Sequence, residues 1–167
     1  MNIEYYKNKD IRPEELHTLA ETQGWGSSRP IERNSKAIEG SIFIASARHK
    51  KRLIGILRLV GDSAYCLHIA DFVVHPEYQR QGIGTKLLKM CLEYAKAERI
   101  GIDENMGEFT LFANVSADVF YEKFGFKLAP NGMVLANSEL RKKHEIDFDK
   151  NWEEARQRHN QKSVKRF

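Results

Sequence analysis

Cysteine is scarce in this chain of 167 residues, which contains only two. Cys66 falls in a predicted strand and Cys91 in a predicted helix, so they form neither a C-x-x-C pair nor a disulfide framework. We expect both to be buried structural thiols of a protein in a reducing compartment, the cytoplasm.

Long apolar runs and clusters of metal ligands are also missing. No apolar stretch approaches the roughly 18 residues of a membrane-spanning helix, and the first residues, Met1–Glu4, lack the shape of a secretory signal. The histidines are scattered without metal-ligand spacing, at positions 17, 49, 68, 75, 144 and 159. We therefore expect no membrane partner and no metal.

The charge balance is basic, with 27 Lys and Arg against 23 Asp and Glu and a net charge of +4. Such a balance suits a polyanionic partner. Nucleic acid is disfavoured, because the basic residues form no continuous stripe with interleaved aromatics and no helix-turn-helix or zinc pattern occurs. Hydrophobic content of 41% with 30% charged residues is typical of a single globular domain.

Hydrophobic periodicity predicts a mixed α/β domain. Apolar residues recur at helical spacing in the long helix expected after residue 82, as they do in a helix that packs on a sheet. A basic turn at residues 49–52 predicts a hairpin. The expected strands are 2–7, 41–48, 53–60 and 65–75, and the expected helices are 13–21, 31–39 and 82–98.

Residues 75–84, His-Pro-Glu-Tyr-Gln-Arg-Gln-Gly-Ile-Gly, predict an anion site. They lie between a strand and a helix, where glycines let backbone N–H groups approach a phosphate and the helix dipole favours negative charge. Arg80 adds a cation. A dinucleotide fingerprint would need glycine in place of Leu87, and a Walker loop would need a lysine directly after Gly84.

The remaining pattern, Gln79-x-x-Gly82-x-Gly84, resembles the acyl-CoA pyrophosphate loop of the GNAT superfamily of N-acetyltransferases. A second match follows at residues 109–126, which end in Tyr-x-x-x-Gly-Phe and are similar to the family's fifth strand and following helix. The resemblance covers roughly residues 2–135 and is strongest to the small-amine branch, which includes arylalkylamine and amino-sugar acetyltransferases.

The resemblance implies an α/β (α+β) fold with a twisted, mixed but mostly antiparallel sheet. The sheet would have six to seven strands, flanked by about four helices, with the fourth and fifth strands splayed apart. Further short strands are expected at 126–129 and 132–136. The acetyltransferase domain would span 1–136, and a basic, helical extension would span 137–167. This extension is expected to be a surface helix or a homodimer contact, and the alternative is an arm that binds nucleic acid or a membrane.

The same resemblance implies where acetyl-CoA, the co-substrate, would bind. Its pantetheine arm would pair with the backbone of Phe72, Val73 and Val74. Asn114 matches a position that hydrogen-bonds the cofactor in relatives, although it could equally be a helix N-cap, for which Ser116 competes. The pyrophosphate would lie on the backbone N–H groups of Arg80, Gln81, Gly82, Ile83, Gly84 and Thr85.

Acetyl transfer by direct attack needs a neutral amine and a proton for the departing thiolate. Tyr121 matches the family's general acid, and the alternative is that it only packs under the cofactor. Asp71 is the preferred base, because a carboxylate in an apolar strand demands an explanation. By strand alternation it would share a face with Ile69 and Val73. A substrate anchor or a salt-bridged core residue is an equal alternative for Asp71.

His68 and Glu108 are weaker candidates for the base. The expected reaction is transfer of an acetyl group to a primary amine of a small molecule. Protein lysine or N-terminal acetylation is one alternative, and a non-catalytic acyl-CoA sensor is another. Trp25, Phe43 and Tyr65 could supply an aromatic wall for the amine, or core packing could explain the last two.

Overall fold

Five strands, taken in the order of the chain, form one sheet in the computed structural model, which describes residues 2–25, 29–98, 108–113 and 117–127. The chain divides into two units, residues 1–112 and 113–167. The first contains β1 (Glu4–Tyr6), α1 (Pro13–Glu21), α2 (Ile31–Glu39), β2 (Phe43–His49), β3 (Arg52–Gly61), β4 (Cys66–Val74), the 3-10 turn η2 (Pro76–Tyr78), α3 (Ile83–Ala97) and β5 (Glu108–Leu111); α4 (Asp118–Glu122) lies in the second.

The pairing of the strands is mixed and mostly antiparallel, as the resemblance implies. Strands β1 to β4 pair antiparallel in sequence order, and β5 pairs parallel to β4. Of the further strands expected, residues 126–127 are not in a strand, and 128–129 and 132–136 lie outside the described residues. The predicted extension at 137–167 also lies outside them. The described sheet therefore has five strands where six to seven were expected.

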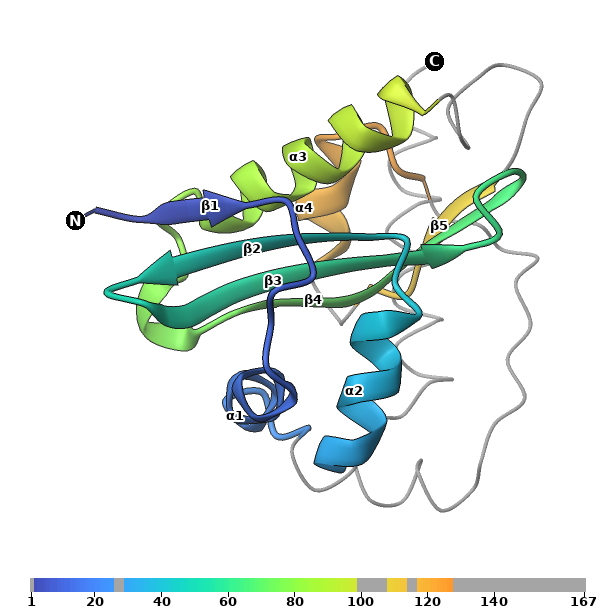
Figure 1. Cartoon of the computed structure of the whole chain (residues 1–167). Coiled ribbons are helices and arrows are strands. Elements are labelled where there is room, and N and C mark those ends of the chain that lie inside the picture. Colours follow the sequence, from blue (N-terminus) through green and yellow to red (C-terminus); the bar gives the residue numbers. More distant parts are fainter. Residues whose placement is uncertain (1, 26–28, 99–107, 114–116, 128–167) are drawn as a thin grey trace. The chain divides into compact units, whose positions relative to one another are not determined.

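The helices cover both faces of the sheet. In Figure 1, α3 lies on one face, and α1 and α2 lie on the other. Both α1 and α2 coincide with the predicted ranges, and α3 is one residue shorter at each end. Gly55 permits close packing of α3, because a Cβ there would lie 3.1 Å from Leu87 Cδ1 and 3.3 Å from Ile83 Cγ2.

A hydrophobic cluster fills the space between the sheet and the first two helices. Its members come from α1 and the residues just before it, from α2 and from three strands, and Trp25 packs against it from the segment after α1. Because the cluster joins segments far apart in the chain, it fixes how the α1–α2 connection sits on the sheet. The buried members are Ile11, Leu16, Leu19, Ile38, Ile44, Leu53, Ile56 and Val73.

Strand β4 contains an irregularity that changes which side chains share a face. Leu57 pairs with Phe72, but Leu59, two residues further, pairs with Ile69, three residues earlier in β4. Since paired residues project to the same face, Ile69 shares a face with Phe72, and Asp71 lies on the opposite face. The expectation that Asp71 and Ile69 share a face is therefore wrong, and a β-bulge is the reason.

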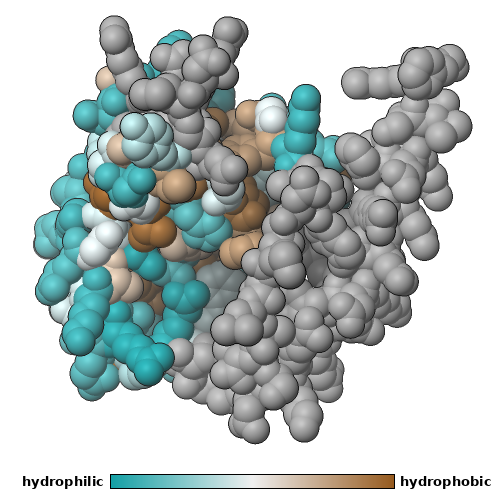
Figure 2. Space-filling model, turned by 90° about the vertical axis from the view of Figure 1, so that its right-hand side faces the viewer, coloured by the Kyte–Doolittle hydropathy of each residue, from teal (hydrophilic) through white to brown (hydrophobic). Residues whose placement is uncertain are grey.

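Several large hydrophobic side chains are exposed in the described part of the chain. Tyr65, Phe112 and Val119 are each more than half exposed. Figure 2 shows one side of the molecule, on which hydrophobic residues reach the surface among hydrophilic ones. Cys66 is also exposed, which corrects the expectation that both thiols are buried, whereas Cys91 is buried. Within the described ranges, no helix has the length and apolar character to cross a membrane.

Candidate functional site

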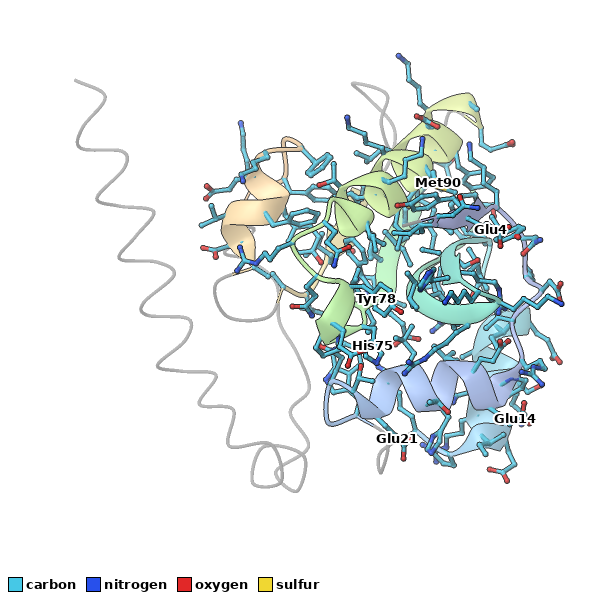
Figure 3. The ribbon with its side chains drawn as sticks, turned by 90° about the vertical axis from the view of Figure 1, so that its left-hand side faces the viewer. Glu4, Glu14, Glu21, His75, Tyr78 and Met90 are labelled. Atoms are coloured by element: carbon cyan, nitrogen blue, oxygen red, sulfur yellow. The ribbon has the colours of Figure 1, made fainter. Side chains whose placement is uncertain are left out.

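The turn that follows β4 is held against the hairpin formed by β2 and β3. His75 Nε2 lies 2.9 Å from Arg52 Nη2, and His49 Nδ1 lies 3.0 Å from the hydroxyl of Tyr78. Figure 3 shows His75 and Tyr78 together at this turn. His75 also accepts a hydrogen bond from the backbone N–H of Glu77 at its Nδ1, at 3.3 Å. These contacts fix the path of the chain between β4 and α3.

The backbone immediately before α3 adopts the left-handed conformation twice. Arg80 has φ 61° and Gly82, the N-cap of α3, has φ 80°. A Cβ at Gly82 would meet nothing within 4 Å, so the space around this glycine is open. The first backbone N–H groups of a helix have no acceptor within the helix. Here they follow a left-handed turn, the geometry of an anion-binding concavity.

Two glutamine side chains of this loop donate hydrogen bonds to backbone carbonyls that precede them in the chain. Gln79 Nε2 donates to the carbonyl of Val74 at 3.0 Å, and Gln81 Nε2 donates to the carbonyl of Glu77 at 3.2 Å. Arg80 and Gln81 are themselves exposed, whereas the side chain of Ile83 is buried. A ligand at this loop would therefore meet the Ile83 backbone rather than its side chain.

Strand β4 extends beyond the end of its pairing with β5. Their parallel pairing runs from Cys66 and Glu108 to Ile69 and Leu111, but β4 continues to Val74. The stretch Phe72–Val74 predicted to pair with pantetheine lies in this continuation. The resemblance implies that the fourth and fifth strands splay apart in this part of β4.

Asp71 lies in the same part of β4 and is ion-paired with two arginines. Its side chain is 2% exposed, its Oδ2 accepts a hydrogen bond from Arg58 Nε at 2.7 Å, and its Oδ1 pairs with Arg29 Nη1. Arg58 is 7% exposed and also donates from Nη1 to the Ala37 carbonyl and to Ser41 Oγ. A buried carboxylate thus has two cationic partners.

Arg29 reaches Asp71 from the connection between α1 and α2. Its Cζ lies 5.3 Å from the centroid of the Trp25 ring, and its side chain is 37% exposed. Sequence reasoning missed Arg29 and Arg58. Arg58 could have been noticed as a cation in the apolar interior of β3, because a buried carboxylate needs such a partner. Nothing in the sequence pattern marks Arg29, since its contact depends on how the α1–α2 connection folds.

The alternative bases lie in the part of β4 and β5 that is paired. His68 Nδ1 lies 2.9 Å from Thr110 Oγ1, and its ring centroid is 5.2 Å from that of Phe112. Burial lowers the pKa of His68, which favours the neutral imidazole at neutral pH. Glu108 pairs with Cys66 at the start of β5.

Tyr121 belongs to the second unit, where it lies in α4. Its ring contacts those of Phe120 and Phe126, with centroids at 5.2 Å and 5.9 Å. Gly125 has φ 90°, and this left-handed residue turns the chain so that the Phe126 N–H donates to the Tyr121 carbonyl at 3.3 Å. Burial raises the pKa of Tyr121 to about 12. Asn114 and Ser116 lie outside the described residues.

The three aromatic residues proposed as an acceptor wall are not on one surface. Phe43 is buried and stacks on Tyr94 of α3 with ring centroids 4.5 Å apart, so it belongs to the core on the α3 face. Trp25 packs on the opposite face, and Tyr65 is exposed in the turn between β3 and β4. Among the described residues, no group of three or more His, Cys, Asp or Glu could hold a metal.

Comparison with known proteins gives one family. A model of the acetyltransferase (GNAT) family matches residues 10–126. Histone acetyltransferase TAP1 of Glycine max is 31% identical over 135 residues, which cover 74% of this chain and 55% of that protein. The uncharacterized N-acetyltransferase ycf52 of Gracilaria tenuistipitata var. liui is 31% identical over 137 residues, which cover 80% of this chain and 71% of that protein. The chain thus spans about half the length of the soybean relative.

Solved structures show the same fold. A GNAT-family acetyltransferase of Streptococcus pneumoniae superposes with a TM-score of 0.67 at 27% identity, covering 82% of this chain and 99% of that one. The PaiA N-acetyltransferase of Thermoplasma acidophilum, solved in complex with coenzyme A, has a TM-score of 0.64 at 20% identity, covering 79% of this chain and 94% of that one.

Proposed function

The chain belongs to the acetyltransferase (GNAT) family, and we propose that it transfers an acetyl group from acetyl-CoA to a primary amine of a small molecule. The observation that carries the acetyl-CoA part of this proposal is the left-handed turn at Gly82. This turn begins α3 after the short connection that follows β4, a strand that extends beyond its pairing with β5. A helix start with open space supplies an anion site for a pyrophosphate, and the continuation of β4 supplies backbone for an extended arm.

We assign two parts of acetyl-CoA to the N-terminus of α3 and to the end of β4. The pyrophosphate would lie against the backbone N–H groups from Arg80 to Thr85, and the pantetheine arm would follow Phe72–Val74. The family fold supports this placement, as does the likeness to the Thermoplasma acidophilum structure in complex with coenzyme A. A side chain at Gly82 would enter the space that the phosphates need, which is why glycine suits that position.

The proposed chemistry is direct attack. The amine nitrogen attacks the thioester carbonyl carbon, the C–N bond forms, and the C–S bond then breaks to release the thiolate of coenzyme A. Tyr121 donates its hydroxyl proton to that thiolate and the resulting tyrosinate regains a proton from solvent, while the nitrogen loses a proton to water. A tyrosine whose pKa is raised to about 12 by burial keeps its proton until the thiolate forms.

The part played by Asp71 follows from its partners. Both of its oxygens contact guanidinium groups, which supports the substrate-anchor and salt-bridged alternatives over a base that takes the ammonium proton. We propose that the amine loses its proton to water and that Asp71 organises the acceptor side of the site.

Protein acetylation is the second candidate, favoured by the likeness to a soybean protein named as a histone acetyltransferase. The full chain should be incubated with acetyl-CoA and either a panel of small primary amines or a peptide library, with acetylated products identified by mass spectrometry. Faster turnover of small amines supports the proposal, and faster turnover of peptides favours the alternative. Tight binding of acetyl-CoA without turnover of either set would indicate a sensor.

A further inference from the structure

The ion-paired group formed by Arg29, Asp71 and Arg58, here called the Arg29 cluster, contains two cations and one anion. Arg58 directs its N–H groups to Asp71, to the Ala37 carbonyl and to Ser41 Oγ, and its side chain is 7% exposed. The positive charge of Arg58 is therefore paired with Asp71 inside the protein. Arg29 is 37% exposed, so the unbalanced positive charge of the cluster is presented to solvent by Arg29.

Arg29 is held in place by two different contacts. One Nη atom pairs with the buried carboxylate of Asp71, and the guanidinium lies over the ring of Trp25. Trp25 itself packs against the hydrophobic cluster on this face of the sheet. An arginine fixed in this way loses little conformational freedom when it binds an anion, and its planar fork matches a carboxylate.

The cluster also lies at a defined place along β4. Asp71 immediately precedes the Phe72–Val74 stretch and lies where β4 leaves its pairing with β5. If acetyl-CoA follows that stretch, as the proposed function requires, the Arg29 cluster is next to one end of its pantetheine arm. An anionic group on the acceptor molecule would then be close enough for the guanidinium of Arg29 to attract it.

We propose that Arg29 selects acceptor amines that also carry a carboxylate, and that Asp71 is a positioning residue that holds Arg29 for this purpose. The inference rests on the proposed function and adds an acceptor class to it. The competing explanation is that the Arg29–Asp71 pair only fastens the α1–α2 connection to the sheet. Loss of such a fastening would affect acidic and neutral acceptors alike, which makes the two explanations separable.

The test compares matched amines that differ by one carboxylate, namely tyrosine with tyramine, γ-aminobutyrate with propylamine, and lysine peptides with a neighbouring glutamate or glutamine. In the unaltered protein, kcat/KM should be about tenfold higher for the acidic member of the preferred pair, the scale of one charge-assisted hydrogen bond. Arg29→Gln should bring the ratio close to one while the neutral amine stays within about threefold. Arg29→Lys should keep part of the preference.

Arg33→Gln is the matched control, because Arg33 is an exposed arginine of α2 and the substitution removes the same charge. It should leave the ratio unchanged. A ratio near one in the unaltered protein, or an equal fall for both amines in Arg29→Gln, would overturn the inference and leave acetyl transfer intact. Binding of acetyl-CoA without turnover of any amine would instead overturn the proposed function, and this inference with it.

Asp71→Asn gives a second measurement. As a positioning residue, Asp71 acts through Arg29, so the variant should raise KM for the acidic amine and keep the pH profile of kcat/KM unchanged in shape. Loss of the low-pH limb of that profile would show that Asp71 accepts a proton, and would contradict the positioning role. Should this variant fail to fold because Arg58 is left without its counter-ion, the Arg29 variants still decide the proposal.

Discussion

The hydroxyl of Tyr121 has surroundings that keep it protonated. Burial penalises the charged phenolate, which raises the pKa of Tyr121 to about 12. The raised pKa keeps the phenol protonated at neutral pH, but it also makes the hydroxyl a weaker acid, so it supports the protonation state and not proton donation itself. The same burial also fits a packing role, because the ring contacts Phe120 and Phe126. Only removal of the hydroxyl separates the two.

Tyr121→Phe keeps the ring and deletes the proton donor. We expect kcat to fall by roughly 10²–10⁴, the usual contribution of a positioned acid. KM for acetyl-CoA should change little, because the lost interaction belongs to the transition state. Steady-state kinetics of both proteins tests this expectation. A fall of less than about fivefold in kcat would make Tyr121 a packing residue.

The pH profile of the unaltered enzyme provides a separate check. The neutral phenol is the active form of the acid, and its pKa of about 12 lies above the ordinary value of 10.0. Activity that depends on this proton should therefore persist through pH 10 and decline only as pH rises toward 12. A rate that falls with an apparent pKa near 10 and is unaffected in Tyr121→Phe would assign that limb to another group.

Among the secondary-structure elements, α3 and the turn before it carry the proposed cofactor site. The turn is fixed by contacts of His75 and Tyr78 with the β2–β3 hairpin, and α3 is fixed by its buried stripe against the sheet. The N-terminus of α3 therefore has a rigid support. This rigidity allows a local substitution in the turn to act on ligand binding without disturbing the fold.

Gly82→Asp should abolish binding of acetyl-CoA, because it brings a carboxylate into the anion site. Gly24→Asp is a matched control, since Gly24 has φ 75° against φ 80° at Gly82, and a Cβ at either position meets nothing within 4 Å. Both variants carry the same backbone strain and the same charge. Calorimetric titration should show lost affinity only for Gly82→Asp. If its affinity stayed within about threefold, a difference under 1 kcal/mol, the phosphates bind elsewhere.

The ion pair between α1 and β2 should contribute to stability above acidic pH. Glu15 accepts hydrogen bonds from Arg48 at 2.7 Å and 3.1 Å, and the Arg48 guanidinium lowers the pKa of Glu15 from 4.5 to about 2. A depressed carboxyl pKa gives stability that is complete above pH 4.5 and is lost as pH falls toward 2. This pair therefore connects α1 to the sheet in a pH-dependent way.

Glu15→Gln should lower the free energy of unfolding at pH 7 by about 1.5–3 kcal/mol, the range for a hydrogen bond to a charged group. The difference from the unaltered protein should shrink as pH falls toward 2. Glu14→Gln is the control, because Glu14 is exposed on the same turn of α1. Denaturant unfolding at several pH values measures both. An equal effect of the two substitutions would show that the contact with Arg48 is not the cause.

For the whole molecule, the described residues of the proposed cofactor site all lie in the unit that ends at Phe112. The motifs that predict acetyl-CoA binding end by residue 126, and the basic segment 137–167 follows them. That segment was predicted to be a surface helix or a dimer contact, and it stays a prediction.

Deletion of residues 137–167 should spare acetyl-CoA binding, because the deleted segment follows every residue assigned to the cofactor. Calorimetry should give the same affinity for the shortened and full chains. Light scattering of both tests the dimer contact. If the full chain is a dimer and the shortened chain has the mass of a dimer as well, the segment is not the main contact.

The sequence alone determined features that depend on neighbouring residues. The bounds of α1 and α2, the glycine turn before α3 and the Tyr-x-x-x-Gly-Phe turn follow from local preferences, so they could be predicted without knowing the rest of the fold. The family motifs added the expected co-substrate and the mixed, mostly antiparallel sheet, because such motifs are local too.

Only the tertiary structure decided what surrounds Asp71. The bulge in β4 sets the face on which Asp71 lies, and its partners come from β3 and from the α1–α2 connection. The regular alternation of a strand predicts that Ile69 shares a face with Asp71. It cannot predict the bulge, because the register depends on how β4 pairs with β3. The Arg29 cluster therefore depends on long-range packing. Burial of the Asp71 carboxylate is costly unless cations pair with it, and the two arginines that do so come from segments far from Asp71 in the sequence.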